Sequence, residues 1–161
     1  PEKYRLPFVF MEQTACRVGE TFLFTAADVD WAGERVRMRA STTKAARSRW
    51  VQVPGWLIDL LKAHVPSRPE GRPVFDGSSQ GMQEAMREAC RKAGTAFYSP
   101  HKLRHRRASL WHGQGISAAE LAMRTGHSSK TVALEVYSNV MPLDEVAAES
   151  MFAAVTGNHG S

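Results

Sequence analysis

The sequence predicts an α+β fold that is mostly α, in which a small antiparallel sheet packs against a helical domain. One stretch alternates strictly between basic and apolar residues, as a strand with one buried face does. Several later stretches repeat apolar residues at helical spacing. The strands do not alternate with the helices along the chain, so a doubly wound parallel sheet is not expected.

Two strands are expected to form a hairpin over residues 35–53. In the run ERVRMRA, Val36 and Met38 point to one side and the arginines to the other, and RSRWVQV supplies the returning strand. The connecting segment STTKAA places Lys44 at the tip of the hairpin. The turn-forming run DVDWAGE lies before the hairpin, and a short first strand is expected there as well.

Two amphipathic segments follow the hairpin. Residues 56–64 place leucines on one stripe of a helix, and residues 81–93 place small and apolar side chains on one continuous face. Gly94 is expected to end the second helix. The segment between them, VPSRPEGRPVFDGSS, is rich in proline and glycine and is expected to be a surface loop.

Capping residues mark the start of two further helices. Ser99 and Pro100 suit the N-cap and the first turn of one helix. Ser117 and Glu120 have the spacing of a capping box at the start of a shorter helix, which Gly126 ends.

Length and composition restrict the possible classes of protein. The 161 residues are enough for one domain with a sizeable core, and they end in a predicted helix over 129–137 and a last helix and tail over 142–161. A net charge of +5 favours a polyanionic partner. No apolar run approaches the length of a membrane span, so no membrane partner is expected. Cys16 and Cys90 are expected to be reduced thiols.

The stretch SPHKLRHRRASLWH gathers three histidines and four basic side chains without a carboxylate. His101 falls in the first turn of its helix, where unpaired backbone N–H groups favour an anion. Arg104 follows one turn later, and its planar guanidinium matches the oxygens of a phosphate. His101 and His105 also have a spacing that zinc sites use. No third ligand is at hand and the arginines would repel a dication, so no metal is expected.

Five short motifs occur in order along residues 12–141: ACRVGE, TTKAARSR, HKLRH, RTGHSS and YSNV. With these motifs in this order and at this spacing, the sequence resembles the catalytic domain of the tyrosine recombinases, the phage-integrase family. The resemblance implies the fold of that domain, with the hairpin packed against its helices. Cys16 and Thr21 depart from the apolar residues that usually flank the first motif's arginine and acid.

The resemblance implies a DNA transesterification that needs neither metal nor ATP and passes through a 3′-phosphotyrosine. One tyrosine would be the nucleophile, two arginines would clamp the non-bridging oxygens, and one histidine would donate a third hydrogen bond. A lysine would protonate the leaving 5′-oxygen, and a second histidine would move a proton or bind the phosphate. The nucleophile would be Tyr137, and the clamping arginines would be Arg17 and Arg104. His127 would donate the third hydrogen bond, Lys44 would protonate the leaving oxygen, and His101 would be the second histidine.

Other residues are expected to support this set. Glu20 would orient the first arginine, and His105 would support the site from behind. Four basic residues are expected to contact DNA, and no cofactor is expected. These four are Arg47, Arg49, Lys102 and Lys130.

The resemblance also implies partners and a location. Double-stranded DNA at an attachment or recombination site is the expected substrate, in a synaptic homotetramer, with a monomer possible for an isolated fragment. Residues 1–161 would form a single catalytic domain. Only 16 residues precede Arg17, so the N-terminal core DNA-binding domain of the family is expected to be absent. The last helix would dock on a neighbouring protomer or fold back on its own domain. A bacterial or phage-encoded protein that acts in the cytoplasm at the nucleoid is expected.

Two other functions are compatible with parts of the sequence. SAAELAMRTGHSSKTVALEVY has features of a helix-turn-helix, with Gly126 in the turn, and would suit a non-catalytic DNA-binding module. That interpretation explains the charge but leaves Arg17, Lys44 and the HKLRH motif unexplained. A type IB topoisomerase-like enzyme would use the same chemistry to relax DNA.

Overall fold

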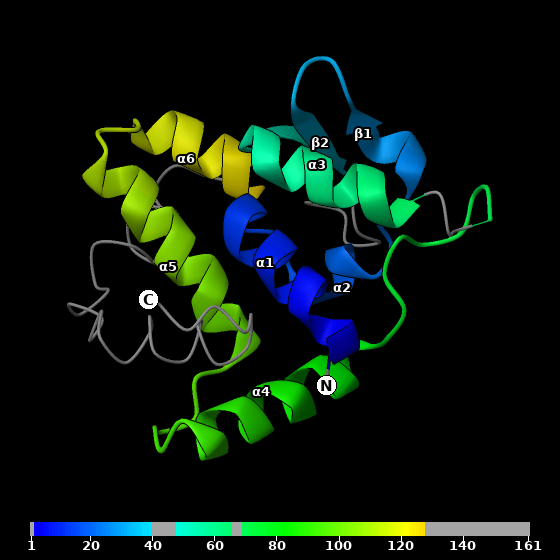
Figure 1. Cartoon of the computed structure of the whole chain (residues 1–161). Helices are drawn as coiled ribbons and strands as arrows, with labels where there is room; N and C mark the ends of the chain where they lie inside the picture. Colours follow the sequence, from blue (N-terminus) through cyan, green and yellow to red (C-terminus); the bar gives the residue numbers. More distant parts are fainter. Residues whose placement is uncertain (1, 40–47, 66–68, 128–161) are drawn as a thin grey trace.

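The computed structural model describes residues 2–39, 48–65 and 69–127, which form a helical body with a three-stranded sheet at one side (Figure 1). The expected mostly helical α+β class is therefore confirmed. The helices predicted over 129–137 and 142–161 lie outside the described residues. In chain order the elements are η1 (Glu2–Tyr4), α1 (Arg5–Thr14), α2 (Val18–Thr21), η2 (Ala26–Asp28), β1 (Val29–Asp30), β2 (Arg35–Met38), β3 (Arg49–Gln52), α3 (Gly55–His64), α4 (Ser79–Lys92), α5 (Pro100–Gly113) and α6 (Ala118–Thr125).

The sheet is antiparallel, with its strands in the order β1-β2-β3. Val36 of β2 pairs with Val51 of β3, and both are fully buried, whereas the next pair joins Arg37 to Trp50 on the outer face. This alternation is the one that the sequence predicts, and the short first strand is also present. The predicted hairpin is confirmed. Its tip, with Lys44, lies outside the described residues.

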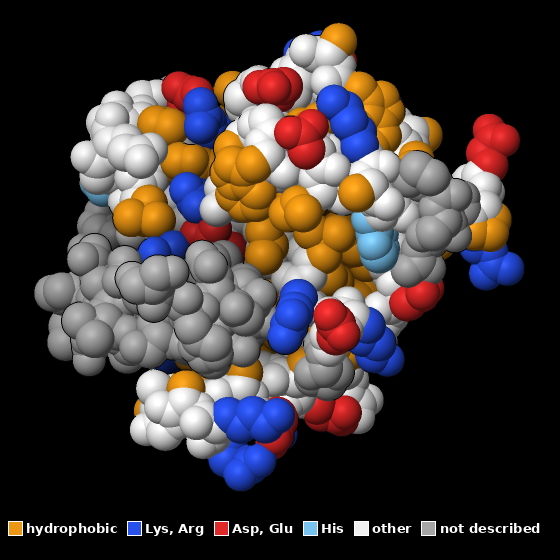
Figure 2. Space-filling view, viewed as in Figure 1, with side chains coloured by type: hydrophobic (Ala, Val, Ile, Leu, Met, Phe, Trp, Pro, Cys, Tyr) orange, Lys and Arg blue, Asp and Glu red, His pale blue; other side chains and the backbone are white. Residues whose placement is uncertain are grey.

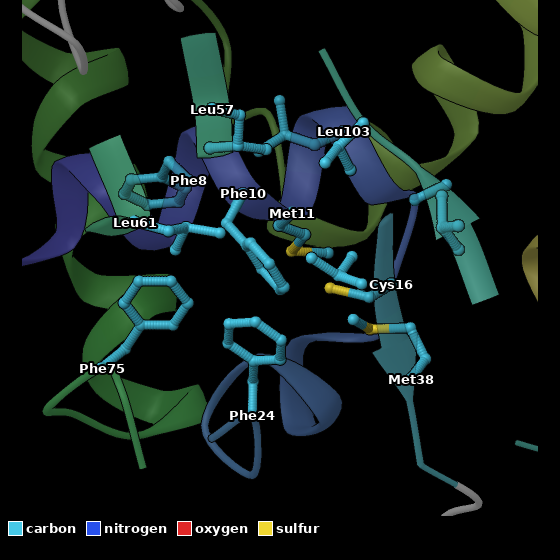
Figure 3. Packing of buried hydrophobic residues seen from close by; sticks show 14 of the residues in the cluster. Phe8, Phe10, Met11, Cys16, Phe24, Met38, Leu57, Leu61, Phe75 and Leu103 are labelled. Atoms are coloured by element: carbon cyan, nitrogen blue, oxygen red, sulfur yellow. The ribbon is translucent and has the colours of Figure 1, made fainter. Parts of the chain in front are cut away.

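The hydrophobic core is built around α1, which lies in the middle of the molecule with α3, α4 and α5 around it (Figure 1). The ring of Phe10 lies 4.5 Å from that of Phe24 and 5.1 Å from that of Phe75, measured between centroids (Figure 3). Such aromatic contacts bring a large apolar area out of water. The core thereby joins the N-terminal helix to two loops, one before and one after the strands in sequence.

A buried carboxylate also joins α1 to α5. The Glu12 carboxylate accepts a hydrogen bond from Arg106 at 2.7 Å and from Arg107 at 2.8 Å on each oxygen. The basic stretch of α5 therefore has an acid supplied by another helix, although none lies near it in sequence. Two of the four cations of this stretch, Arg106 and Arg107, share this one carboxylate inside the protein.

The ends of α5 and α6 follow the predicted capping residues. Pro100 is the first residue of α5 and Ser99 its N-cap, and the Ser117 hydroxyl accepts from the Glu120 amide at the start of α6. The Glu120 carboxylate accepts from the side chain of Arg124, one turn further on. Gly126 ends α6 with φ of +69°, a left-handed conformation that favours glycine. This turn sets the direction of the chain at the candidate site.

The outer face of α3 carries apolar side chains beside the exposed ion pair of Asp59 and Lys62. Trp56 and Leu60 are exposed there, and Figure 2 shows hydrophobic side chains gathered around this helix, with basic and acidic ones scattered among and beyond them. Across the described residues, no helix combines the length and the apolar character needed to cross a membrane. Cys16 and Cys90 are both buried free thiols, as expected.

Candidate active site

The candidate site lies at the C-terminal end of α6, where two arginines from distant parts of the chain meet. Arg104 Nη2 donates to the Thr125 carbonyl at 2.6 Å, and Arg17 Nη2 donates to the next carbonyl, that of Gly126, at 3.3 Å. The two guanidinium groups therefore bind the carbonyls of adjacent residues and lie close to each other. The structure brings together the two arginines that the sequence analysis selected.

Arg104 forms the floor of the site. Arg104 is 1% exposed, and its Nη1 donates a second hydrogen bond, to the Ala15 carbonyl at 2.5 Å. Ala15 ends α1 in a left-handed conformation with φ of 51°, which turns the chain towards α2. Two backbone carbonyls thus hold this guanidinium rigidly below the surface.

Arg17 lies at the edge of the site and remains accessible. It is the N-cap residue of α2, its backbone N–H donates to Glu20 Oε2 at 2.7 Å, and its side chain is 38% exposed. The contact between Arg17 Nη1 and Glu20 Oε1 is long, at 3.4 Å. Arg17 is therefore fixed at its backbone, while its guanidinium is held only weakly.

His127 completes the group beside the two arginines. Its Nε2 lies 3.2 Å from Arg104 Nη2, and its Nδ1 lies 3.0 Å from the Thr125 hydroxyl. That hydroxyl donates to the Leu121 carbonyl at 2.7 Å, so it accepts from Nδ1–H, and Nε2 accepts from Arg104. Burial, followed by the positive charges of Arg104 and Arg17, lowers the pKa of His127 to about 4. The imidazole is therefore neutral at pH 7.

His101 and His105 form a neighbouring pair on α5, with edge-to-face rings whose centroids are 4.5 Å apart. Burial and then the charges of Arg104 and Arg17 lower the pKa of His101. Burial, His101 and Arg104 lower the pKa of His105. His101 is exposed and can meet a substrate, whereas His105 lies deeper. Among the described residues, no three histidine, cysteine or acidic side chains cluster in a way that could hold a metal ion.

Arg49, which the sequence analysis selected as a DNA contact, is enclosed in the protein. Its side chain is 4% exposed, and its two terminal nitrogens donate to the Glu20 carboxylate at 2.9 and 2.8 Å. Its Nε donates to the Arg124 carbonyl at 2.7 Å. Both terminal nitrogens and Nε of Arg49 are therefore engaged by protein groups, and the expected contact of Arg49 with DNA stays a prediction. The alternation along β3 carried the signal, since Arg49 shares the inward face with Val51.

The Glu20 carboxylate lies between the two arginines of this side of the site. Burial by itself would raise the pKa of Glu20, but the hydrogen bonds and the charge of Arg49 outweigh that effect and hold the pKa below its ordinary value. The carboxylate is therefore ionised at neutral pH, and it links β3 to the start of α2.

The remaining predicted residues divide into two groups. Lys102 is exposed on α5, with its ammonium 5.6 Å from the centroid of the Tyr98 ring, so it is accessible to DNA. The others lie outside the described residues, namely Lys44, Arg47, Lys130 and Tyr137. Thr125, whose hydroxyl sets the tautomer of His127, was missed by the sequence analysis, and no pattern in the sequence marks it.

Solved structures resemble this fold. XerA recombinase matches with a TM-score of 0.72 at 19% identity, over 92% of this chain and 57% of that one. The Tn1549 transposon integrase in complex with circular intermediate DNA matches with a TM-score of 0.72 at 15% identity, over 91% and 58%. The catalytic domain of bacteriophage HP1 integrase matches with a TM-score of 0.64 at 19% identity, over 99% and 95%. These matches show a shared fold.

Sequence comparison adds to the structural likeness. An integrase of Mycobacterium phage FRAT1 is 25% identical over an alignment of 175 positions, gaps included. The alignment covers 93% of this chain and 53% of the relative. The chain therefore spans about half the length of that curated relative. The phage integrase family matches residues 1–143, which is most of the sequence. The chain belongs to the phage integrase family.

Proposed function

We propose that the chain is the catalytic domain of a site-specific DNA recombinase that breaks and rejoins DNA through a 3′-phosphotyrosine, without metal or ATP. The observation that carries this proposal is the meeting of Arg17, Arg104 and a neutral His127 at the end of α6. Two guanidinium groups and one imidazole, drawn from residues as far apart in sequence as Arg17 and His127, lie at one place. Such an arrangement suits a phosphate whose negative charge increases in the transition state.

The two arginines would serve the phosphate in different ways. Arg104 is already held by the Ala15 and Thr125 carbonyls, so it needs no rearrangement when the charge develops. Arg17 is exposed and weakly bound, so it can turn towards a phosphate. A hydrogen bond from His127 Nε2 to the phosphate requires the other tautomer, in which Nδ1 accepts from the Thr125 hydroxyl.

The proposed reaction exchanges one phosphodiester bond for another and moves two protons. The phenol oxygen of Tyr137 attacks phosphorus, and the bond from phosphorus to the 5′-oxygen breaks. The phenol proton passes to His101, whose lowered pKa keeps it neutral and able to accept at pH 7. Lys44 gives a proton to the departing 5′-oxygen. The phosphotyrosine is itself a phosphodiester, so the reverse attack by a 5′-hydroxyl rejoins DNA without an external energy source.

The proposal includes the partners expected from the sequence. Residues 1–161 would act as one catalytic domain on double-stranded DNA at an attachment or recombination site, within a homotetramer during synapsis. The Tn1549 integrase matched above is a complex with DNA, which supports a DNA substrate for this fold. A phage-encoded or bacterial protein with this activity would work in the cytoplasm at the nucleoid.

The test is a covalent-capture experiment with nicked duplexes of randomised sequence, end-labelled so that cleavage traps the protein on DNA. We expect a protein–DNA band on a denaturing gel for the wild type, no band for Tyr137→Phe, and the same band in the presence of EDTA. Equal bands for the wild type and Tyr137→Phe would overturn the proposed activity. Loss of the band with EDTA would overturn its independence of metal.

A further inference from the structure

We propose that Arg49 is a positioning residue. By binding the Glu20 carboxylate, Arg49 keeps that carboxylate from pairing with Arg17 and so leaves the Arg17 guanidinium available for a phosphate. This inference rests on the proposed function and deepens it. In this proposal Arg49 acts through Glu20 and Arg17 and not on the phosphate, because both of its terminal nitrogens donate to the Glu20 carboxylate.

The first step of the argument is the competition for Glu20. Arg49 binds both oxygens of the carboxylate at 2.8 and 2.9 Å, whereas Arg17 Nη1 reaches one of them at only 3.4 Å. A buried carboxylate requires a cation. With Arg49 absent, Arg17 is the remaining cation beside it, and the attraction would draw the Arg17 guanidinium inwards. A phosphate would then have to compete with Glu20 for the same donors.

The second step concerns the end of α6. Arg49 Nε donates to the Arg124 carbonyl at 2.7 Å. A Cβ atom placed on Gly126 would lie 2.8 Å from Arg49 Nη1, so the guanidinium packs directly against this turn. The Gly126 carbonyl is the group that accepts from Arg17 Nη2. Arg49 therefore supports both the acid and the carbonyl that surround Arg17.

The third step is the position of Arg49 in the sheet. It pairs with Met38 in the last described pair of β2 and β3, next to the connecting segment that contains Lys44 in sequence. Arg49 consequently joins the base of the hairpin to α2 and to α6. A single side chain thereby connects the three elements whose neighbouring residues are proposed to act on the phosphate.

Arg107 offers a matched control. It binds both oxygens of the buried Glu12 at 2.8 Å and its Nε donates to the Glu12 carbonyl at 3.0 Å, so it makes the same kinds of contact as Arg49. Its partners belong to α1, outside the group formed by Arg17, Arg104 and His127. A lysine keeps the charge at either position. At position 49 it loses a contact made by two guanidinium nitrogens, whereas Arg107 reaches both Glu12 oxygens through Nη2 alone.

The experiment compares Arg49→Lys, Arg107→Lys and wild type in three measurements. These are single-turnover capture on the nicked duplexes, affinity for the same duplexes, and affinity for inorganic orthovanadate, a mimic of the transferring phosphoryl group. We expect Arg49→Lys to slow capture on the order of tenfold to a hundredfold and to weaken orthovanadate binding, with duplex affinity unchanged. Arg107→Lys should leave all three unchanged. Urea unfolding selects conditions in which every variant is folded.

A rescue variant separates positioning from general damage. Arg49→Met should lose orthovanadate binding, because Arg17 then pairs with Glu20. The double variant Arg49→Met with Glu20→Gln removes that competing charge and should recover part of the binding. Equal orthovanadate affinity in Arg49→Lys and Arg107→Lys, or no recovery in the double variant, would overturn the proposal. A wild type that binds orthovanadate but gives no Tyr137-dependent band would instead overturn the proposed function, and the two failures remain distinct.

Discussion

Two buried glutamates, Glu12 and Glu20, are each bound by two arginines, yet the two clusters differ in how much cationic surface they leave exposed. In the Glu12 cluster, Arg106 and Arg107 approach the carboxylate to 2.7 and 2.8 Å, and their side chains are only 22% and 16% exposed. Both arginines belong to α5, and their ion pairs with Glu12 join that helix to α1. The cluster is closed and presents little to a ligand.

In the Glu20 cluster the two arginines have separate tasks. Arg49 is buried and binds the carboxylate on both oxygens, while Arg17 lies at the edge, with a contact of 3.4 Å and a side chain that is 38% exposed. In both clusters one arginine binds both carboxylate oxygens, so the number of cations around the acid does not separate them. The second arginine does: Arg106 contacts its acid at 2.7 Å and is 22% exposed, whereas Arg17 contacts its acid at 3.4 Å and is 38% exposed.

Removing the charge of each acid should have the largest effect on stability. Glu20→Gln leaves Arg49 enclosed without a counter-charge, and we expect it to reduce the free energy of unfolding by about 3–5 kcal/mol. In Glu12→Gln the arginine heads can still reach water, so we expect a smaller loss of about 2 kcal/mol. Urea denaturation at pH 7 measures both. A larger loss for Glu12→Gln than for Glu20→Gln would contradict the assignment of Arg49 as the more deeply enclosed cation.

A second test uses the glycine that packs against Arg49. Gly126 and Gly94 both have a left-handed backbone, with φ of +69° and +65°, but only Gly126 has a neighbour where a Cβ would be, since nothing lies within 4 Å at Gly94. We expect Gly94→Ala to cost about 1 kcal/mol from backbone strain alone. Gly126→Ala should cost about 2–3 kcal/mol, because Arg49 must also move. Thermal unfolding of the pair checks this, and equal losses would show that the Arg49 contact is unimportant.

The titration of His127 also reports on Arg49. Its pKa of about 4 lies below the ordinary 6.5, so the folded protein binds this proton more weakly than the unfolded chain does. The resulting stability is complete above pH 6.5 and is lost as the pH falls through 4. Arg49 is one of the charges that lower this pKa. In an NMR titration, Arg49→Gln should raise the midpoint of His127, and Arg107→Gln should leave it unchanged. A shift of equal size in both variants would contradict the local origin of the effect.

The sequence predicted the parts of this site that local chemistry encodes. Arg104 and His127 lie in short motifs beside recognisable helix starts and ends, and the turn at Gly126 follows from the preference of glycine for a left-handed conformation. The hairpin followed from the alternation of Val36 and Met38 with arginines. Such signals depend on neighbours a few residues apart, so they can be read without the fold.

Long-range pairings could not be predicted in the same way. Glu12 lies 94 positions before Arg106, and nothing in α1 marks it as a buried acid, because helical periodicity separates apolar from polar residues and does not show which polar residue is enclosed. Arg49 is the instructive exception. Its inward position could have been read from the strand period, but its basic character favoured a role at the surface.

The enclosure of Arg104 has a consequence for how ionic strength would act on the protein. Mobile ions weaken interactions between solvent-exposed charges, but they screen groups inside the protein much less. Arg104 is 1% exposed, whereas Lys102 on the same helix faces solvent. In the proposed reaction, added salt should therefore weaken the capture of DNA by accessible cations more than it weakens the contact of bound DNA with Arg104.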